Sequence, residues 1–476
     1  MRQTNKRFLI IKYLCVVAVI FMSICGFSAS VAVAYTDSEN ADIYKSIDDY
    51  LNDVTTKANF PSLSIAIVDK ETTLFSKSYG DCESPDVPYL LGSVSKSFTA
   101  LSIMQLAEQG KIDLNAELSQ YLPNATDGDN ISIIQLLNHT SGLGEHQNLT
   151  NYKIVGKQGV HTYANVNYSL LGKVVEKVSG TDYASYVTDN IFAPLCMTKS
   201  FADIGKAKEN GLIQGYESWF GINTKTNAKF SNSDSAWITT SAGYLSSSVS
   251  DLGKYLQMYL NGGKGIISAD SINKMFYQGV EVEANIPYRY AMGWTLINEP
   301  LKQPALRHSG LVETGMSVVY ILPESEIGIA IAVNTNDYFV GKDMMDRIDW
   351  GVVLMIMGDE PNQIGANEYV LKHLLYDFIY LLVFAIAVLP IFLIAHYKKM
   401  LASGKLWVKV LLLTLLHLIL PVTLLLLPQI FFSTPLWVVK AFVPDMFTVI
   451  IVSACLLFAC GIVKIFLLVK HKLKSV

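Results

Sequence analysis

Three apolar runs near the C-terminal end constrain the fold of this chain more than any other feature. Residues 378–395, 410–432 and 446–463 contain no Asp, Glu, Lys or Arg. Each run approaches the roughly 20 apolar residues that a helix needs to cross a bilayer. We therefore predict that residues 361–476 form a segment of three transmembrane helices.

The lysines around these runs indicate one orientation in the membrane. Four lysines lie between the first and second runs, and the C-terminal tail carries Lys470, Lys472 and Lys474. Between the second and third runs the only lysine is Lys440. Because cytoplasmic loops carry an excess of positive charge, the first loop and the C-terminus are predicted to be cytoplasmic, and the residues before the first run to lie outside.

Residues 1–34 carry a second, independent export signal. Four basic residues within positions 1–12 precede an apolar run that ends in Ala32-Val33-Ala34, which is the pattern of a signal peptide with its cleavage site. An uncleaved N-terminal anchor is the alternative, because the run is nearly long enough to span a membrane. Either interpretation exports residues 35–360. We expect a multi-pass protein of the cell membrane with an extracytoplasmic domain and a cytoplasmic C-terminus.

The composition argues against several classes of partner. The formal net charge is -4, with 37 basic against 41 acidic residues, so no nucleic-acid-binding face is expected. There is no Cys-x-x-Cys pair and no His-Glu-x-x-His motif, so neither a metal site nor another cofactor is expected. Cys82 and Cys196 are the cysteines outside the apolar terminal segments. A disulfide between them is one alternative for an exported domain, and the sequence does not decide it.

The order of strand and helix patterns predicts an α/β domain over residues 35–360. The expected elements are a helix at 40–58, paired strands at 62–68 and 72–80, a helix-rich stretch from about 110 to 260, and strands at 291–296, 317–322 and 328–333. Strands from both chain ends would then form one antiparallel sheet flanked by helices, with the helical stretch as an insertion.

A Ser-x-x-Lys pattern opens the helix that follows the first strand pair. Ser93 lies at the start of an apolar helical pattern, and Lys96 lies one turn further along on the same face. A serine hydroxyl becomes a good nucleophile when a neighbouring base takes its proton. On these four residues alone, an N-cap serine followed by a solvated lysine is the simpler interpretation, so the other motifs must decide.

Two further motifs offer polar groups to a pocket. Tyr163-Ala164-Asn165 precedes an apolar helix, and a phenolate at Tyr163 would be favoured beside a lysine cation and could act as a general base. His308-Ser309-Gly310 precedes a strand, and the missing side chain of Gly310 lets a ligand lie close to the backbone. Each motif alone also fits a plain helix cap or a lone histidine without a catalytic role.

In order and spacing, Ser93-x-x-Lys96, Tyr163-x-Asn165 and His308-x-Gly310 resemble the motifs of the serine β-lactamase-related family. That family includes class C β-lactamases, D-alanyl-D-alanine carboxypeptidases, D-aminopeptidases and some esterases. The resemblance covers about residues 40–350 and implies the penicillin-recognising serine hydrolase fold, followed here by the three transmembrane helices. Three further stretches are also similar to landmarks of the family: 131–143, 242–252 and 292–294.

The resemblance also implies a role for each residue of the site. Ser93 would be the acylated nucleophile, Lys96 and Tyr163 would share the base and proton-shuttle roles, and Asn165 would orient Lys96 and the substrate amide. The backbone N–H groups of Ser93 and Leu311 would form an oxyanion hole. The implied substrate-binding residues are Asn165, His308, Ser309, Gly310 and Leu311.

His308 occupies the position where β-lactamases of this family usually carry lysine, and members with His-x-Gly are more often peptidases or esterases. The resemblance therefore implies a membrane-bound extracytoplasmic serine hydrolase that acts through an acyl-serine intermediate. Its expected substrates are peptides with D-residues, either cell-wall peptides or peptide antibiotics, and some members that act on such antibiotics also carry a C-terminal three-helix segment. The alternatives are a β-lactamase, an esterase, or a sensor that binds a penicillin or peptide without turnover. The oligomeric state is left open.

Overall fold

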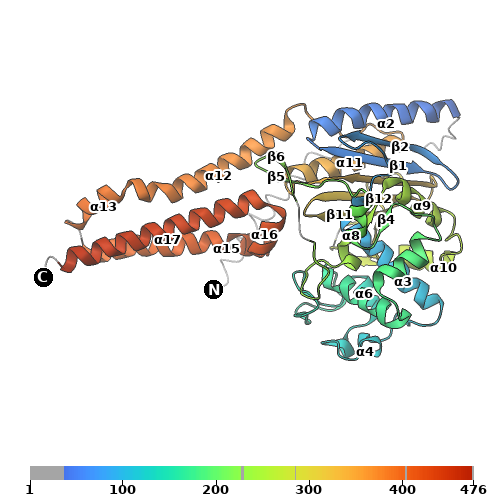
Figure 1. Ribbon diagram of the computed structural model, residues 1–476, viewed down its shortest axis with the longest axis horizontal. Coiled ribbons are helices and arrows are strands. Elements are labelled where there is room, and N and C mark those ends of the chain that lie inside the picture. Colours follow the sequence, from blue (N-terminus) through green and yellow to red (C-terminus); the bar gives the residue numbers. More distant parts are fainter. Residues whose placement is uncertain (1–36, 227–229, 285, 403–404, 474–476) are drawn as a thin grey trace. The chain divides into compact units, whose positions relative to one another are not determined.

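The computed structural model describes residues 37–226, 230–284, 286–402 and 405–473 (Figure 1). Contacts divide the chain at residue 45, and Ser46–Val476 form one compact unit. Helix α2 (Asp37–Lys57) begins before this unit and continues into it. The signal peptide or anchor expected at residues 1–34 lies outside the described residues.

An eight-stranded antiparallel sheet forms the centre of the region before residue 360. Strand β1 (Ser62–Val68) is buried along its whole length because it lies between its hairpin partner β2 (Thr73–Gly80) and the late strand β13 (Ile327–Val333). The prediction that both chain ends build one sheet is therefore confirmed. Beyond β13 the order continues with β12 (Gly315–Leu322), β11 (Ala305–Val312), β10 (Trp294–Ile297), β9 (Tyr288–Ala291) and β8 (Val280–Glu281).

Helices cover this sheet. Helix α9 (Val249–Leu260) packs against β1 and β13, whereas α11 (Val340–Ile356) packs against β12 and lies on the side of α2 (Figure 1). The hydroxyl of Tyr50 in α2 donates a hydrogen bond to the carbonyl oxygen of Asn362, just beyond α11, at 3.0 Å. Helix α2 is the helix predicted at residues 40–58.

The predicted helical insertion lies between β2 and β8. Its helices are α3 (Ser95–Glu108), α4 (Leu118–Tyr121), α5 (Ile133–Leu137), α6 (Asn165–Ser179), α7 (Tyr183–Val187), α8 (Ile204–Glu209), α9 and α10 (Ala269–Tyr277), with the single turns η1 (Gly92–Val94), η2 (Gly128–Asn130), η3 (Thr188–Phe192) and η4 (Thr240–Tyr244). It also contains short strands, of which β3 (Tyr89–Leu90) precedes the helix-rich stretch predicted at about 110 to 260. Those that this prediction missed are β4 (Ser200–Phe201), β5 (Tyr216–Trp219), β6 (Ile222–Lys225) and β7 (Ser246–Ser247), with β14 (Thr335–Asn336) joining β5. Strands of this length are too short to show an alternating pattern.

The strand expected at residues 291–296 is in fact two strands joined by a tight turn, so this prediction was wrong. Strands β9 and β10 pair across a turn at Met292 and Gly293, whose φ angles are +43° and +87°. A Cβ atom on Gly293 would lie 2.8 Å from Cα of Ser97 and 3.0 Å from the carbonyl oxygen of Lys96. Glycine therefore lets this hairpin rest directly on the backbone of α3.

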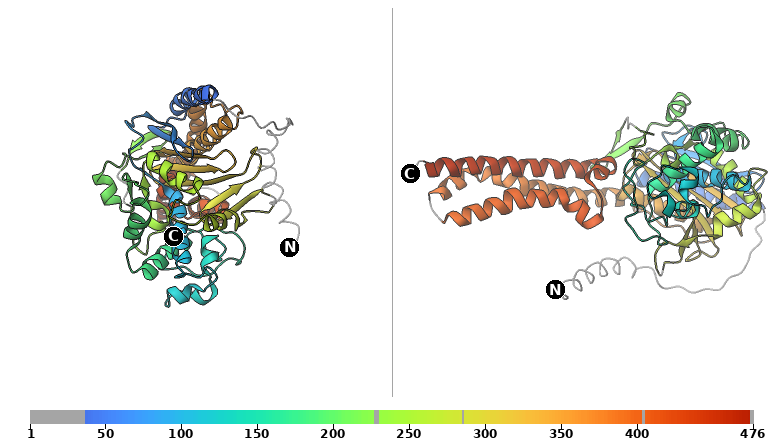
Figure 2. Two further views of the ribbon diagram at one scale, coloured as in Figure 1. Left: turned by 90° about the vertical axis from the view of Figure 1, so that its right-hand side faces the viewer. Right: turned by 90° about the horizontal axis from the view of Figure 1, so that it is seen from below.

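Three helices after residue 360 are long and apolar enough to cross a membrane. They are α12 (Glu368–Phe392), the stretch Leu406–Phe432 formed by α14 (Leu406–Thr414), η5 (Leu415–Ile419) and α15 (Leu420–Phe432), and α17 (Pro444–Leu473), with α13 (Ile394–Leu401) and α16 (Leu436–Phe442) between them. Helix α17 packs against both α12 and α15 (Figure 2). Their most apolar windows are only 17% to 33% buried, as expected for helices whose apolar sides face lipid. The three predicted spans thus correspond to three helices.

The two cysteines outside the terminal apolar segments are unpaired. Cys82 is buried, and its thiol donates a hydrogen bond to the carbonyl oxygen of Ser84 at 3.3 Å. Cys196 is exposed. Of the two alternatives left open by the sequence, the structure therefore has the one without a Cys82–Cys196 disulfide.

Gly293→Ala is expected to lower the thermal unfolding midpoint of the full-length protein in detergent more than Gly110→Ala does, by roughly 2–4 °C or more. Both glycines have positive φ angles, +87° and +69°, so both substitutions strain the backbone. An added Cβ at Gly110 meets nothing within 4 Å, whereas at Gly293 it also pushes against α3. Equal midpoints for the two variants would show that the hairpin does not depend on this close approach.

Candidate active site

Ser93 lies in a turn that is held tightly against the sheet. This turn, η1, leads directly into α3, and its first residue, Gly92, has a φ angle of +53°. A Cβ on Gly92 would lie 2.4 Å from the backbone nitrogen of Leu311, and a Cβ on Gly310 would lie 1.9 Å from the carbonyl oxygen of Leu91. The two glycines let the backbone around Ser93 touch β11, which fixes the position of Ser93 relative to that strand.

Lys96 lies one helical turn after Ser93 and is completely buried. Its Nζ lies 3.0 Å from Ser93 Oγ, 2.7 Å from Asn165 Oδ1 and 2.6 Å from the carbonyl oxygen of Ala242. Burial penalises the ammonium form, and none of these three oxygen atoms carries a charge that would compensate. The pKa of Lys96 is therefore well below its ordinary value.

A neutral amine fits this set of partners. It has two N–H groups and one lone pair, whereas an amide oxygen and a peptide carbonyl oxygen can only accept hydrogen bonds. The two N–H groups of Lys96 therefore donate to Asn165 and to the carbonyl of Ala242. The lone pair is left for the hydroxyl proton of Ser93, so Lys96 can act as a base on Ser93.

Tyr163 reaches the site from the loop before α6, and Asn165 is the first residue of that helix. The Nζ of Lys96 lies 4.9 Å from the centroid of the Tyr163 ring. Burial raises the pKa of Tyr163, and a hydrogen bond with Ser93 opposes this effect only in part. The expected phenolate beside a lysine cation is therefore wrong, because desolvation favours a neutral phenol beside a neutral amine.

His139 holds the loop that carries Tyr163. Its ring is completely buried, and its centroid lies 4.3 Å from that of the Tyr163 ring. Its Nδ1 accepts hydrogen bonds from the backbone N–H of Ala164 at 3.2 Å and from Asn167 Nδ2 at 2.8 Å. Burial lowers the pKa of His139 well below its ordinary value, so the ring stays neutral and Nδ1 is free to accept.

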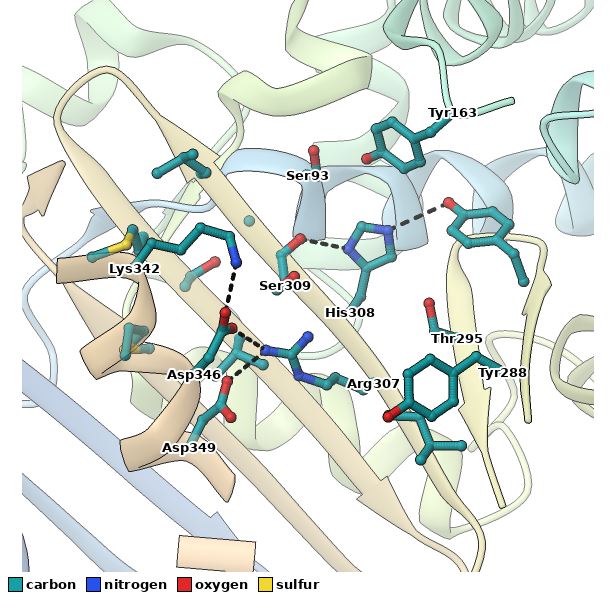
Figure 3. Close-up of a pocket in the computed structure, with 18 of the residues that line it drawn as sticks. Ser93, Tyr163, Tyr288, Thr295, Arg307, His308, Ser309, Lys342, Asp346 and Asp349 are labelled. Carbon is teal, nitrogen blue, oxygen red and sulfur yellow. Dashed lines mark hydrogen bonds and ion pairs between the residues drawn. The ribbon is translucent and has the colours of Figure 1, made fainter. Parts of the chain in front are cut away.

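His308 lies on β11 and is 5% exposed. A carbonyl oxygen can only accept, so Nδ1–H donates to the carbonyl of Ser309 at 2.9 Å, and Nε2 accepts from the hydroxyl of Tyr290 at 3.3 Å (Figure 3). Burial is the main cause that lowers the pKa of His308 to about 3. A neutral imidazole therefore occupies this position at physiological pH.

A cavity of about 480 Å³ opens at Ser93 (Figure 3). Of the residues predicted for the site, those that line this cavity are Ser93, Tyr163, His308, Ser309, Gly310 and Leu311. Lys96 and Asn165 do not line it, but Lys96 contacts Ser93 and Asn165 contacts Lys96 through the hydrogen bonds given above. The structure therefore brings all of the predicted residues together around one serine.

Sequence reasoning missed two groups that contact the catalytic candidates. One is the carbonyl oxygen of Ala242 in η4, which accepts from Lys96, and the other is the hydroxyl of Tyr290, which contacts His308. The first is a backbone atom, and the only sequence signal that could have pointed to it is the 242–252 landmark, which begins at Ala242. Tyr290 lies two residues before the 292–294 landmark, which is the only sequence signal that could have pointed to it.

An ion cluster also borders the cavity. Arg307 Nη2 lies 2.9 Å from Asp346 and 2.7 Å from the fully buried Asp349, so it ties β11 to α11, and Lys342 pairs with Asp346 at 2.6 Å (Figure 3). This cluster could not be predicted from the sequence because its members lie on two elements. Within the described ranges, no group of three or more His, Cys, Asp or Glu side chains could hold a metal ion.

A buried lysine lies within hydrogen-bond distance of a serine at the start of a helix, and this helix packs against an antiparallel sheet built from both chain ends. This combination places the protein among serine hydrolases of the penicillin-recognising fold. Comparison with known families makes the assignment more specific. Residues 47–351 match the beta-lactamase family, and the chain belongs to that family. The three apolar helices lie outside the matched residues.

Individual relatives agree with this assignment. Protein flp of Staphylococcus aureus strain N315 is 29% identical over an alignment of 336 residues. The alignment covers 63% of this chain and 65% of that protein, so the chain spans less than two thirds of this relative. An octameric penicillin-binding protein homologue from Pyrococcus abyssi is 25% identical, with a TM-score of 0.59 over 68% of this chain and 80% of that one. A D-alanine carboxypeptidase from Burkholderia cenocepacia, 18% identical, shares the fold with a TM-score of 0.54 over 65% of this chain and 99% of that one.

Asn165→Asp is expected to shift the pH dependence of Ser93 acylation. Acylation should accelerate as pH rises through the pKa of Lys96, because only the neutral amine can accept the proton of Ser93. A carboxylate 2.7 Å from Nζ would stabilise the ammonium form and raise this pKa, moving the rising limb to higher pH by roughly one unit or more.

The measurement is the rate of labelling by a fluorescent penicillin as a function of pH. Asn165→Ala is the matched control, because it removes the same hydrogen bond without adding a charge. Coincident profiles for the two variants would mean that Lys96 is not the group whose deprotonation controls acylation.

Proposed function

We propose that this protein is a membrane-bound hydrolase that acts through an acyl intermediate on Ser93. The observation that carries the proposal is the buried Lys96 amine 3.0 Å from Ser93 Oγ, with a pKa that burial lowers well below its ordinary value. In the first step, Ser93 Oγ attacks the carbonyl carbon of the substrate while its proton passes to Lys96 Nζ. Asn165 holds the amine in place because its Oδ1 accepts a hydrogen bond from one of the N–H groups of the amine.

The later steps use the groups around Ser93. The backbone N–H groups of Ser93 and Leu311 donate to the negative charge that develops on the carbonyl oxygen. Tyr163, as a neutral phenol, passes the proton from Lys96 to the leaving nitrogen or oxygen, and the bond from that atom to the carbonyl carbon breaks. Water then attacks the carbonyl carbon of the ester on Ser93, and its proton passes through the same groups to Ser93 Oγ. The bond from Oγ to the carbonyl carbon breaks, which releases the acid and restores the serine hydroxyl.

We propose peptides with D-residues as the substrates, from the cell wall or among peptide antibiotics. Support comes from the structural neighbour that is a D-alanine carboxypeptidase and from His308, which stands where β-lactamases of the family usually carry lysine. The neutral imidazole of His308 supplies no positive charge for a carboxylate. The histidine at this position thus favours a peptidase or carboxypeptidase over a dedicated β-lactamase.

A β-lactamase or esterase activity is the second candidate, because the matching family is that of the beta-lactamases. A sensor without turnover is the third, because α16 of the membrane segment packs with residues of the hydrolase domain in one apolar cluster. The neutral Lys96 supports acylation equally in all three cases. The rate of deacylation separates them.

We also propose the domain limits and the topology. Residues 1–34 act as signal peptide or anchor, 35–360 form the extracytoplasmic hydrolase domain, and 361–476 form the membrane segment. The lysine distribution supports this orientation. The hydrogen bond that Asn336 Nδ2 donates to the carbonyl oxygen of Phe442 at 3.1 Å also supports it, because this bond joins the hydrolase domain to the stretch between the second and third apolar helices.

Ser93→Ala is expected to abolish covalent labelling of the full-length protein by a fluorescent penicillin, and Lys96→Ala is expected to lower the labelling rate by about 1,000-fold or more while the protein still folds. An intact-mass time course on the labelled wild-type protein follows loss of the label. A D-residue peptide ester is used as a second substrate. A hydrolase returns to its unmodified mass within the assay. Permanent acylation would indicate the sensor, and wild type that is neither labelled nor active would refute the proposal.

Cys196 provides a native reporter of the topology because it is exposed in the hydrolase domain. A membrane-impermeant maleimide is expected to label it in intact cells, and Cys196→Ser should remove this label. Lys399→Cys in the Cys196→Ser background should be labelled only after permeabilisation, because residue 399 lies in the proposed cytoplasmic loop. Labelling of residue 399 in intact cells would reverse the orientation.

A further inference from the structure

A second cavity opens at Ser93, apart from the one that contains His308. Its volume is about 230 Å³, and Ser93, Tyr163 and Asn165 lie at its inner end. The remaining walls come from both the hydrolase domain and the membrane segment: Glu145, His146, Trp237, Ile238, Leu311, Tyr338 and Phe339 from the first, and Pro428, Phe432, Thr434, Val438, Val439, Phe442, Val443 and Met446 from the second. The membrane segment therefore forms part of the site.

Hydrogen bonds hold the membrane side of this cavity against the domain. His146 Nε2 contacts the carbonyl oxygen of Ser433 at 3.0 Å, just before α16. The backbone N–H of Phe220 donates to Asp445 Oδ2 at 3.1 Å, just after α16. Together with the Asn336–Phe442 bond, these contacts fix the helix at both ends.

Aromatic packing adds to these bonds along α16. The Trp237 ring lies 5.2 Å from that of Trp437 and 6.0 Å from that of Phe442, measured between centroids. Val438 and Phe442 are buried in one apolar cluster with Ile238. The wall formed by α16 is therefore packed firmly against the hydrolase domain.

The membrane segment contributes a side of this lining that suits a hydrocarbon chain, whereas the domain side also carries Glu145, His146 and Tyr338. The membrane side is aliphatic and aromatic except for Thr434, and no Lys or Arg is among the described residues that line the cavity. Val439 is 6% exposed and faces this space, whereas Phe432, at the end of the second span, is 62% exposed. The cavity thus runs from the end of a membrane span to the catalytic serine, and an apolar chain could follow it without crossing water.

We propose that the substrate of Ser93 is amphiphilic, with its reactive carbonyl at Ser93 and an apolar chain in the cavity beneath α16. This rests on the proposed hydrolase function and specifies its substrate class. It also accounts for the number of spans. One helix suffices to anchor a domain, but the apolar wall is the connection between a second span and a third.

Two fluorophosphonates that differ only in chain length, ethyl and dodecyl, test this proposal on the full-length protein at one fixed detergent concentration. Each reagent forms a P–O bond with Ser93 as the P–F bond breaks and fluoride leaves. The measured quantity is the ratio of the second-order rate constants, dodecyl over ethyl, from intact mass. In wild type this ratio is expected to exceed 1.

Val439→Trp fills the cavity and is expected to lower the ratio by about tenfold, the effect of losing the burial of roughly two methylene groups. Leu436→Trp places the same bulk on the same helix outside the cavity lining and is expected to leave the ratio unchanged. Comparing variants in one detergent cancels the partitioning of the long reagent into micelles. Val439→Ala enlarges the cavity and should raise the ratio above that of wild type.

The outcomes separate this inference from the proposed function. If neither reagent modifies Ser93 in wild type, the hydrolase function itself fails. If both reagents modify it and the ratio is the same in wild type, Val439→Trp and Val439→Ala, the amphiphilic substrate is refuted while the hydrolase stands. If Leu436→Trp lowers the ratio as much as Val439→Trp does, the effect is a general disturbance of α16 and the inference is likewise refuted.

Discussion

The burial of Lys96 is the constraint on which the rest of the site depends. An amine in a dry interior keeps its proton only when a counter-charge compensates for the lost hydration. Here the groups around the amine are neutral oxygen atoms, which supply no counter-charge. They come from three elements: Ser93 before α3, Asn165 at the start of α6 and Ala242 in η4. A carboxylate in place of any of them would retain the proton and leave Ser93 without a base. The fold therefore excludes charge from the point where it brings these elements together.

Close backbone contacts give this arrangement its geometry. Gly92 and Gly310 let the turn before α3 touch β11, so the nucleophile and the backbone N–H of Leu311 stand side by side. Gly293 lets the β9–β10 hairpin rest on the other side of the same helix. An early helix is thereby held between two late parts of the sheet, which is why the site forms only when both chain ends have paired. Neutral His308 adds hydrogen bonding to this frame without adding charge.

The sequence predicts those parts of the structure that depend on side-chain type and spacing. Ser93 and Lys96 stand one turn apart, and the three charge-free runs match three long helices. It does not predict what depends on burial or on the backbone. The turn at 292–293 lies between apolar residues and therefore resembles a continuous strand. The carbonyl oxygen of Ala242 is a backbone atom, so no residue type marks its role. The neutral state of Tyr163 follows from desolvation, which the spacing of residues in the sequence cannot reveal.

The two cavities that meet at Ser93 differ in the way that hydrolysis of an amphiphile requires. An acyl-enzyme whose chain lies in a hydrocarbon environment still needs water at its ester carbonyl. The 480 Å³ cavity, bordered by His308 and the Arg307 ion cluster, is polar enough to admit that water. The 230 Å³ cavity beneath α16 offers the apolar chain of the proposed substrate a wall of side chains from the membrane segment. Water and chain can then reach Ser93 by separate routes, so the helix that completes the apolar route belongs to the catalytic architecture as much as to the membrane anchor.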